Sequence, residues 1–249
     1  MIKLFNTDSI WSAKGTIQTA PSGFRYGFIS NLFREDVYEE LLSSFPAVET
    51  FKLVDKQSGG GRKRFYQGSQ YDSDKNRGCV CHLERLPKIW KDVLRESASP
   101  EFMTLLSEST GLQFNSLNVF GFTFGNEGCM QEAHLDGVIR DNPIEIKSPI
   151  ACLLYFNEKP DDASGTCVYA PDKKTVLFQA PHMRNGLFFF QQHPDAWHGF
   201  PVMPAGTERR VISLAYNREK EPVHFRESLI HKATCIPGLK QRIKFFLGK

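Results

Sequence analysis

From Ser116 onward the sequence consists of short segments rich in β-branched and aromatic residues, separated by turn residues, and no helical repeat interrupts them until the last residues. Several short strands that do not alternate with helices exclude a doubly wound α/β sheet and favour a double-sheet jelly roll or a barrel. We expect strands at residues 117–124, 149–157, 166–170, 175–178, 186–191 and 209–217.

The first half of the chain is typical of helices joined by loops. Apolar residues repeat at helical spacing in 38–45 and again in 89–94, which predicts two amphipathic helices. A third helix is expected to begin with Ser99 as its capping residue and Pro100 in its first turn, and to end at Gly111. The fold class predicted for the whole chain is therefore mainly β with flanking helices around a jelly-roll core.

Between the first two helices, residues 57–78 are polar and rich in glycine and show little periodicity, which predicts a mobile loop. Such a loop is either a lid whose Arg62 and Arg64 reach an anionic substrate or a solvated surface excursion. It is not a Walker phosphate loop, because it lacks the Gly-Lys-Ser/Thr ending.

The length of 249 residues suits one elaborated domain. We divide it into a helical and loop region at 1–112, a jelly-roll catalytic core at 113–220 and a C-terminal extension at 221–249. Within that extension, residues 239–247 are basic and amphipathic. A helix packed on the domain is the preferred interpretation there, and a helix at a membrane surface is the alternative.

The composition of the chain limits the classes of molecule that it is expected to bind. The formal charge of +3 comes from 31 basic and 28 acidic residues spread along the chain, which argues against a nucleic-acid partner but is compatible with an anionic small molecule. No apolar signal core follows Met1 and no run of eighteen apolar residues occurs, so we expect a cytoplasmic protein without membrane contact. The 6 cysteines are expected to be free thiols.

His134 and Asp136 are the first candidates for metal binding. Two positions apart on an extended segment, their side chains point to one face and can bind one ion together. Such a pair often arises by chance, and its weight comes from His198, which follows the expected strand at 186–191. Two histidines and one carboxylate leave three metal positions open, which suits iron(II). We therefore predict that His134, Asp136 and His198 hold the metal and form the catalytic centre.

Arg209 and Ser213 are candidates for binding a co-substrate. A chelating 2-oxo acid with a distal carboxylate needs a fixed cation, and an arginine presents two parallel donors to such a group. Ser213 lies four residues along the same expected strand, on the same face, and offers a hydroxyl. Because neighbouring strand residues face opposite ways, only one of Arg209 and Arg210 can enter the barrel.

In the order of these motifs the sequence resembles the 2-oxoglutarate and iron(II)-dependent dioxygenases, in particular the prolyl-hydroxylase-like group. The resemblance covers roughly Ser116 to Asn217. It rests on His-x-Asp at 134–136, Leu-Leu-Tyr-Phe-Asn at 153–157, Ser-Gly-Thr at 164–166, Asn-Gly-Leu-Phe-Phe-Phe at 185–190, Trp-His at 197–198 and the arginine-led last strand. Matching that last strand to the family selects Arg209 rather than Arg210.

The resemblance implies a double-stranded β-helix that binds Fe(II), 2-oxoglutarate as co-substrate and O2, with ascorbate as a stimulant. It also implies that Tyr155 hydrogen-bonds the distal carboxylate of 2-oxoglutarate beside Arg209, and that Asn118 or Thr123 lines the same pocket. On physical grounds alone, Tyr155 is equally well explained as a core residue with a satisfied hydroxyl.

The implied reaction is hydroxylation of a small-molecule metabolite, coupled to decarboxylation of 2-oxoglutarate to succinate. Desaturation and cyclisation remain open, and so do the substrate and the oligomeric state. Two alternatives stand beside this interpretation: a hydroxylase of a protein or peptide side chain, and a jelly-roll module that binds metal without catalysis.

Overall fold

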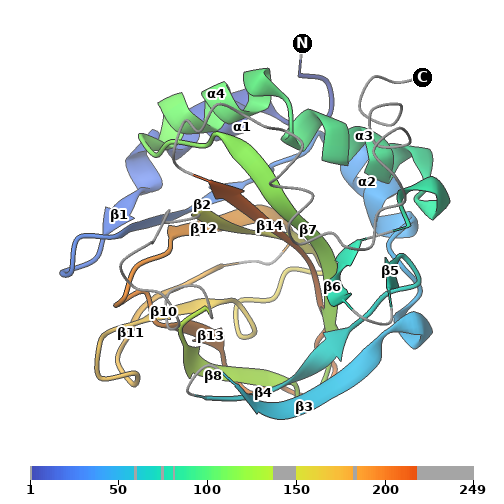
Figure 1. Ribbon diagram of the computed structural model, residues 1–249. Coiled ribbons are helices and arrows are strands. Elements are labelled where there is room, and N and C mark those ends of the chain that lie inside the picture. The colour runs from blue at the N-terminus through green and yellow to red at the C-terminus, as the bar shows by residue number, and fades with distance from the viewer. Residues whose placement is uncertain are drawn as a thin grey trace.

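The computed structural model describes residues 2–58, 61–73, 76–80, 82–136, 150–181 and 184–217, and most of its strands form one antiparallel sheet (Figure 1). This 12-stranded sheet has the order β1-β2-β12-β9-β14-β7-β4-β8-β13-β10-β11, with β3 paired to β4, while β5 and β6 form a separate pair. The strands are β1 (Gln18–Thr19), β2 (Arg25–Ser30), β3 (Lys52–Ser58), β4 (Gly61–Gln67), β5 (Asp72–Ser73), β6 (Asn76–Val80), β7 (Ser116–Gly125), β8 (Met130–His134), β9 (Ile150–Phe156), β10 (Cys167–Tyr169), β11 (Val176–Gln179), β12 (Arg184–Gln191), β13 (His198–Phe200) and β14 (Arg209–Asn217).

The strands from β7 to β14 pair in the pattern of a double-stranded β-helix. One layer runs β12-β9-β14-β7 and the other runs β8-β13-β10-β11, so successive strands repeatedly pass from one layer to the other. The sheet curls until the two layers face each other (Figure 1). The predicted jelly-roll core is confirmed, and the layer that contains β14 is called the main layer below.

Helices cover the outer face of the main layer, as Figure 1 shows. The α-helices are α1 (Thr7–Ser12), α2 (Glu35–Ser43), α3 (Lys88–Ser97) and α4 (Pro100–Thr110), with short 3-10 turns at Ala13–Thr16, Val48–Thr50 and Leu83–Arg85. The Trp90 ring of α3 meets Phe122 of β7 and Phe156 of β9 edge-on, with centroid distances of 5.1 and 5.2 Å. All three side chains are fully buried, so this contact anchors the helices to the sheet.

The three helices expected from sequence are confirmed as α2, α3 and α4. In α4 the Ser99 hydroxyl accepts a hydrogen bond from the amide of Phe102, and Pro100 occupies the first turn. Gly111 ends the helix with a φ of +67°, a conformation that glycine adopts without the steric cost of a side chain.

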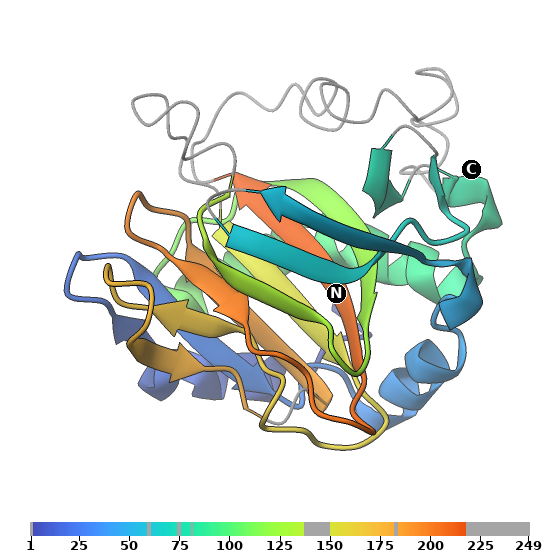
Figure 2. The same cartoon turned by 90° about the horizontal axis from the view of Figure 1, so that it is seen from below.

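The expectation of a loop at 57–78 is wrong. Lys52–Ser58 and Gly61–Gln67 pair along their whole length as the β3–β4 hairpin, and β4 also pairs with β7 and β8. Figure 2 shows this hairpin, in blue-green, continuing the sheet beside the green strands. Backbone pairing on both sides stabilises β4, although its sequence is mostly polar and charged. Because its sequence has no alternation of apolar and polar residues, the strand could not be predicted.

The start of the chain also holds a strand that the helix-and-loop interpretation of the first half missed. β2 pairs with β12 and extends the main layer, with Phe28 opposite Phe188. Elsewhere, Cys129, Cys152 and Cys167 are free and buried, as expected. The proposed extension at 221–249, with its helix at 239–247, lies outside the described residues, and no helix of the described part is both long and apolar enough to span a membrane.

Candidate metal centre

His134 and His198 lie directly opposite each other in the β8–β13 ladder. His134 is the last residue of β8, His198 is the first of β13, and the two are Cα partners. Cross-strand partners project to the same face, so the imidazoles come within 4.2 Å, centroid to centroid. Gly199 permits this approach, because a Cβ there would lie only 2.2 Å from the carbonyl oxygen of Gln131.

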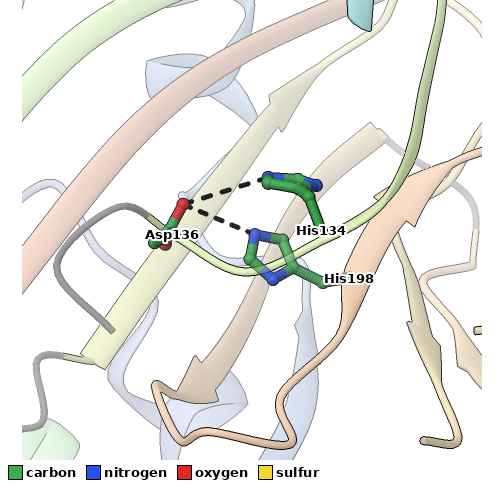
Figure 3. Close-up of side chains that lie close together, drawn as sticks. All are labelled: His134, Asp136 and His198. Carbon is green, nitrogen blue, oxygen red and sulfur yellow. Dashed lines mark ion pairs between the residues drawn. The ribbon is translucent and has the colours of Figure 1, made fainter. Parts of the chain in front are cut away.

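Asp136 completes the group, as Figure 3 shows. Its Oδ1 lies 3.9 Å from Nε2 of His134 and 3.7 Å from Nε2 of His198. One ligand atom from each residue can be chosen so that all three lie within 4.8 Å of one another. A metal with bonds of about 2.1 Å holds neighbouring ligand atoms about 3 Å apart, so a small inward adjustment lets all three bind one ion.

Backbone carbonyls hold both imidazoles in the tautomer that a metal needs. Nδ1 of His134 lies 3.0 Å from the oxygen of Glu132, and Nδ1 of His198 lies 2.9 Å from that of Ala196. A carbonyl only accepts, so each Nδ1 carries the proton and each Nε2 keeps its lone pair for an ion. Burial lowers the pKa of His134 to about 3, which keeps this ring neutral near pH 7.

Two glutamines, which the sequence analysis did not single out, contact the three candidate ligands. The Gln192 amide donates to Oδ2 of Asp136, which leaves Oδ1 directed at the histidines. The side-chain oxygen Oε1 of Gln192 is buried and has no hydrogen-bond partner among the described residues. The Gln131 amide donates to Nε2 of His134 at 2.9 Å and so occupies the lone pair that a bound ion would take in its place. A lone glutamine has no diagnostic spacing, so only the fold reveals either one.

Arg209 is a buried cation on the inner face of the sheet. It opens β14 and is only 6% exposed. One terminal nitrogen donates to the Thr166 hydroxyl at 2.8 Å, whereas Nε has no partner among the described residues. The Phe200 ring centroid lies 4.4 Å from the guanidinium carbon. Burial lowers the pKa of this side chain, so a carboxylate that reached it would satisfy both its charge and its free donor.

Arg210 lies on the opposite face of β14 and already has acidic partners. Its guanidinium contacts Glu158 at 3.1 Å and Glu208 at 2.8 Å. The alternation of the strand therefore places Arg209 inside the barrel and Arg210 on the outer face, where its mostly buried side chain is neutralised by two glutamates.

Tyr155 lies beside Arg209. Its hydroxyl donates to Oγ1 of Thr166 at 2.7 Å, the same atom that receives the bond from Arg209. Thr166 is a further site residue that the sequence analysis placed only in a turn. Ser213 is half-buried, on the same face of β14 as Arg209. Thr123 is buried, and the side chain of Asn118 lies outside the described residues.

Arg62 and Arg64, the two possible anion contacts of the sequence analysis, point away from this centre. The inner face of β4 is marked by Phe65, which packs with Phe200, so the two arginines, one and three positions earlier, lie on the outer face. Both are exposed, and Arg62 is paired with Asp55 at 3.1 Å. The arginines are therefore solvated, although their segment is a strand rather than a loop.

Comparison with known proteins shows the fold. No protein-family model matches the chain, and no curated protein matches it in sequence. Among solved structures it is similar to an oxidoreductase of the 2OG-Fe(II) oxygenase family from Burkholderia pseudomallei, with a TM-score of 0.52 and 12% identity over 78% of this chain and 85% of that one.

Two further structures share the architecture. A prolyl hydroxylase from Trichoplax adhaerens, in complex with a hypoxia inducible factor peptide fragment, has a TM-score of 0.50 and 15% identity, covering 86% of this chain and 90% of that one. The non-heme alpha ketoglutarate dependent epimerase SnoN of nogalamycin biosynthesis has a TM-score of 0.50 and 14% identity, covering 84% and 81%. The chain thus has the jelly-roll fold of these oxygenases.

Proposed function

We propose that this protein is an oxygenase that depends on iron(II) and 2-oxoglutarate and hydroxylates a small molecule. The observation that carries the proposal is the pairing, inside one barrel, of a two-histidine, one-carboxylate centre with a buried arginine that has no acidic partner among the described residues. The fold shared with solved oxygenases supports it.

The donor set fits iron(II). Nε2 of His134, Nε2 of His198 and Oδ1 of Asp136 would hold the ion and leave three positions free, which a chelating 2-oxo acid and O2 require. With these groups bound, iron supplies the oxidation: one atom of O2 enters the substrate as a hydroxyl, the other enters succinate, and CO2 leaves.

Arg209 would bind the distal carboxylate of 2-oxoglutarate. Its guanidinium is held in place by Thr166 and by the ring of Phe200, so little side-chain freedom is lost on binding. The Tyr155 hydroxyl can turn from Thr166 to the same carboxylate, and Ser213 offers a second hydroxyl.

Buried aromatic side chains line the inner face beside the histidines. Phe188 and Phe190 of β12 are fully buried, and Phe190 packs on His198 with a centroid distance of 4.4 Å. Apolar surroundings strengthen the attraction between the buried Arg209 and a carboxylate.

A succinate-release assay tests the proposal. The iron-loaded protein is incubated aerobically with 2-oxoglutarate and ascorbate, with and without candidate small molecules, and succinate and CO2 are quantified. We expect iron-dependent release that a substrate stimulates and that His134→Ala and Asp136→Ala abolish. The matched control is His193→Ala, which removes a nearby half-buried histidine that is not part of the centre.

A second measurement separates binding from turnover. Adding 2-oxoglutarate to the anaerobic iron(II) protein should produce a weak visible absorption band, and Asp136→Ala should lose it. Metal binding without any 2-oxoglutarate binding would instead favour a non-catalytic module. Stimulation by peptides alone would favour the side-chain hydroxylase.

A further inference from the structure

Lys63 brings a second cation to the metal centre. It lies on β4 and is the Cα partner of Gln131 on β8, so the two side chains share a face of the sheet. Gln131 in turn reaches Nε2 of His134. The side chain of Lys63 is therefore on the metal-binding face, next to the position where a substrate must lie.

The charge of Lys63 is not neutralised locally. No ion pair joins it to a carboxylate of the described residues, and its Nζ lies over the Phe65 ring, 5.8 Å from the centroid. Its Cα partner across the hairpin is Lys56, which is also without an acidic partner in the described part. Burial and the charge of Lys56 lower the pKa of Lys63, and the carboxylate of Asp136 raises it by less.

The two faces of the β3–β4 hairpin differ in whether their charged side chains form ion pairs. On the outer face Arg62 bonds both carboxylate oxygens of Asp55. On the inner face two lysines stand opposite each other, an arrangement that destabilises a hairpin unless an anion lies between them. Two neighbouring cations without an acidic partner among the described residues, on the metal-binding side, are what a site for an anionic group requires.

Lys63 is separate from the arginine assigned to 2-oxoglutarate. Arg209 packs on Phe200, Phe200 contacts Phe65 at 6.2 Å between centroids, and Lys63 lies over the Phe65 ring. The two cations thus contact different aromatic rings, and each can bind its own anion.

We infer that Lys63, assisted by Lys56, binds an oxyanion of the substrate, a carboxylate or a phosphate, and so holds the substrate beside the metal. The inference rests on the proposed function, because it takes His134, Asp136 and His198 as the metal ligands. It names the class of substrate: a small molecule that carries an acidic group.

Nuclear relaxation of a simple anion tests this placement without knowledge of the substrate. The protein is loaded with Mn²⁺ and saturated with 2-oxoglutarate, and the relaxation of the ³¹P nucleus of inorganic phosphate is titrated. A second series uses ¹³C-labelled acetate, so that the two series distinguish a phosphate from a carboxylate preference. An anion at Lys63 lies close enough to Mn²⁺ for strong paramagnetic relaxation.

We expect Lys63→Met to weaken binding of the preferred anion at least about tenfold, the size of a charge-assisted hydrogen bond. Lys63→Arg should retain it. The matched control is Arg64→Met, which removes the same charge from the next residue on the outer face and should change binding less than about twofold. Thermal unfolding of each variant establishes that it is folded.

The outcomes are distinguishable. Equal anion relaxation in the wild type, Lys63→Met and Arg64→Met overturns this inference alone. Equal losses in the two methionine variants also overturn it, because they would show general attraction by net charge. Failure of Mn²⁺ to bind, seen directly in its electron paramagnetic resonance spectrum, overturns the metal centre and this inference together.

Discussion

The two faces of the main layer are built from the same strands but hold different chemistry. The outer face, under α3 and α4, is apolar: Ile212, Leu214 and Tyr216 of β14 join it, and the Tyr216 hydroxyl donates to a backbone carbonyl. On the inner face, the same strand contributes Arg209, a buried cation that forms no ion pair among the described residues.

This difference shows how a strand separates stability from function. Successive side chains point to opposite faces, so each strand can pack a helix on one side and hold reactive groups on the other. Buried polar groups without partners destabilise a fold, and the outer apolar face offsets that cost. Variants of the two faces should therefore have opposite consequences.

The largest effect on stability is expected on the outer face. Trp90→Ala removes the ring that meets Phe122 and Phe156 and the indole bond to the carbonyl of Ser44. We expect the free energy of unfolding to fall by about 3–5 kcal/mol, measured by urea denaturation. A loss below about 1 kcal/mol would show that the outer face is not the main source of stability.

Arg209→Met should affect 2-oxoglutarate binding and not the stability of the fold. Removing a buried charge without an acidic partner should leave the stability of the ligand-free protein equal or higher, while 2-oxoglutarate affinity falls about a hundredfold. Absorbance titration under anaerobic conditions measures the affinity. Arg210→Met is the control, with little change in affinity, because its guanidinium lies on the outer face and pairs with Glu158 and Glu208. The reverse ranking would contradict the assignment of Arg209.

Gln192→Leu tests whether the inner face contributes to metal binding without contributing to stability. The amide no longer holds Oδ2 of Asp136, so we expect metal affinity to fall about 10- to 100-fold. The free energy of unfolding without metal should not fall, because the substitution also removes the side-chain oxygen of Gln192, which is buried without a partner among the described residues. Calorimetric titration with Mn²⁺ measures the affinity, and an unchanged value would show that Asp136 needs no such support.

Tyr155→Phe is expected to have the smallest effect. It removes one hydroxyl from the inner face while Thr166 still accepts from Arg209. A single neutral hydrogen bond corresponds to a loss of about three- to tenfold in 2-oxoglutarate affinity, measured as for Arg209. A loss as large as that in Arg209→Met would mean that Tyr155, not Arg209, dominates binding.

Most jelly-roll strands could be predicted because their signals are local, whereas β8 and β13, which carry His134 and His198, were not among the expected strands. Six expected strand segments correspond to β7, β9, β10, β11, β12 and β14, since β-branched and aromatic residues bounded by turns mark them. The convergence of His134, Asp136 and His198 was predicted from motif order, and the structure brings the three together. It also places Arg209 beside Tyr155, 5.6 Å from the guanidinium carbon to the ring centroid.

The hairpin was missed for a physical reason. β4 is stabilised by its neighbours β7 and β8, which lie far along the chain, and its one buried aromatic side chain, Phe65, is too little to form a pattern. The same error drew attention to Arg62 and Arg64 and away from Lys63, because the face of a residue is undefined until its strand is known. Thr166 and Gln192 were missed since polar partners of a site carry no spacing of their own.

The direct pairing of His134 with His198 also determines when the site can exist during folding. The two ligands come from segments far apart in the chain, and a slip of β8 against β13 by one residue would turn one imidazole away from the other. A metal ion therefore has no assembled site until the long-range ladder has closed in its native register. It can then stabilise only the finished barrel, by an amount that grows with its free concentration.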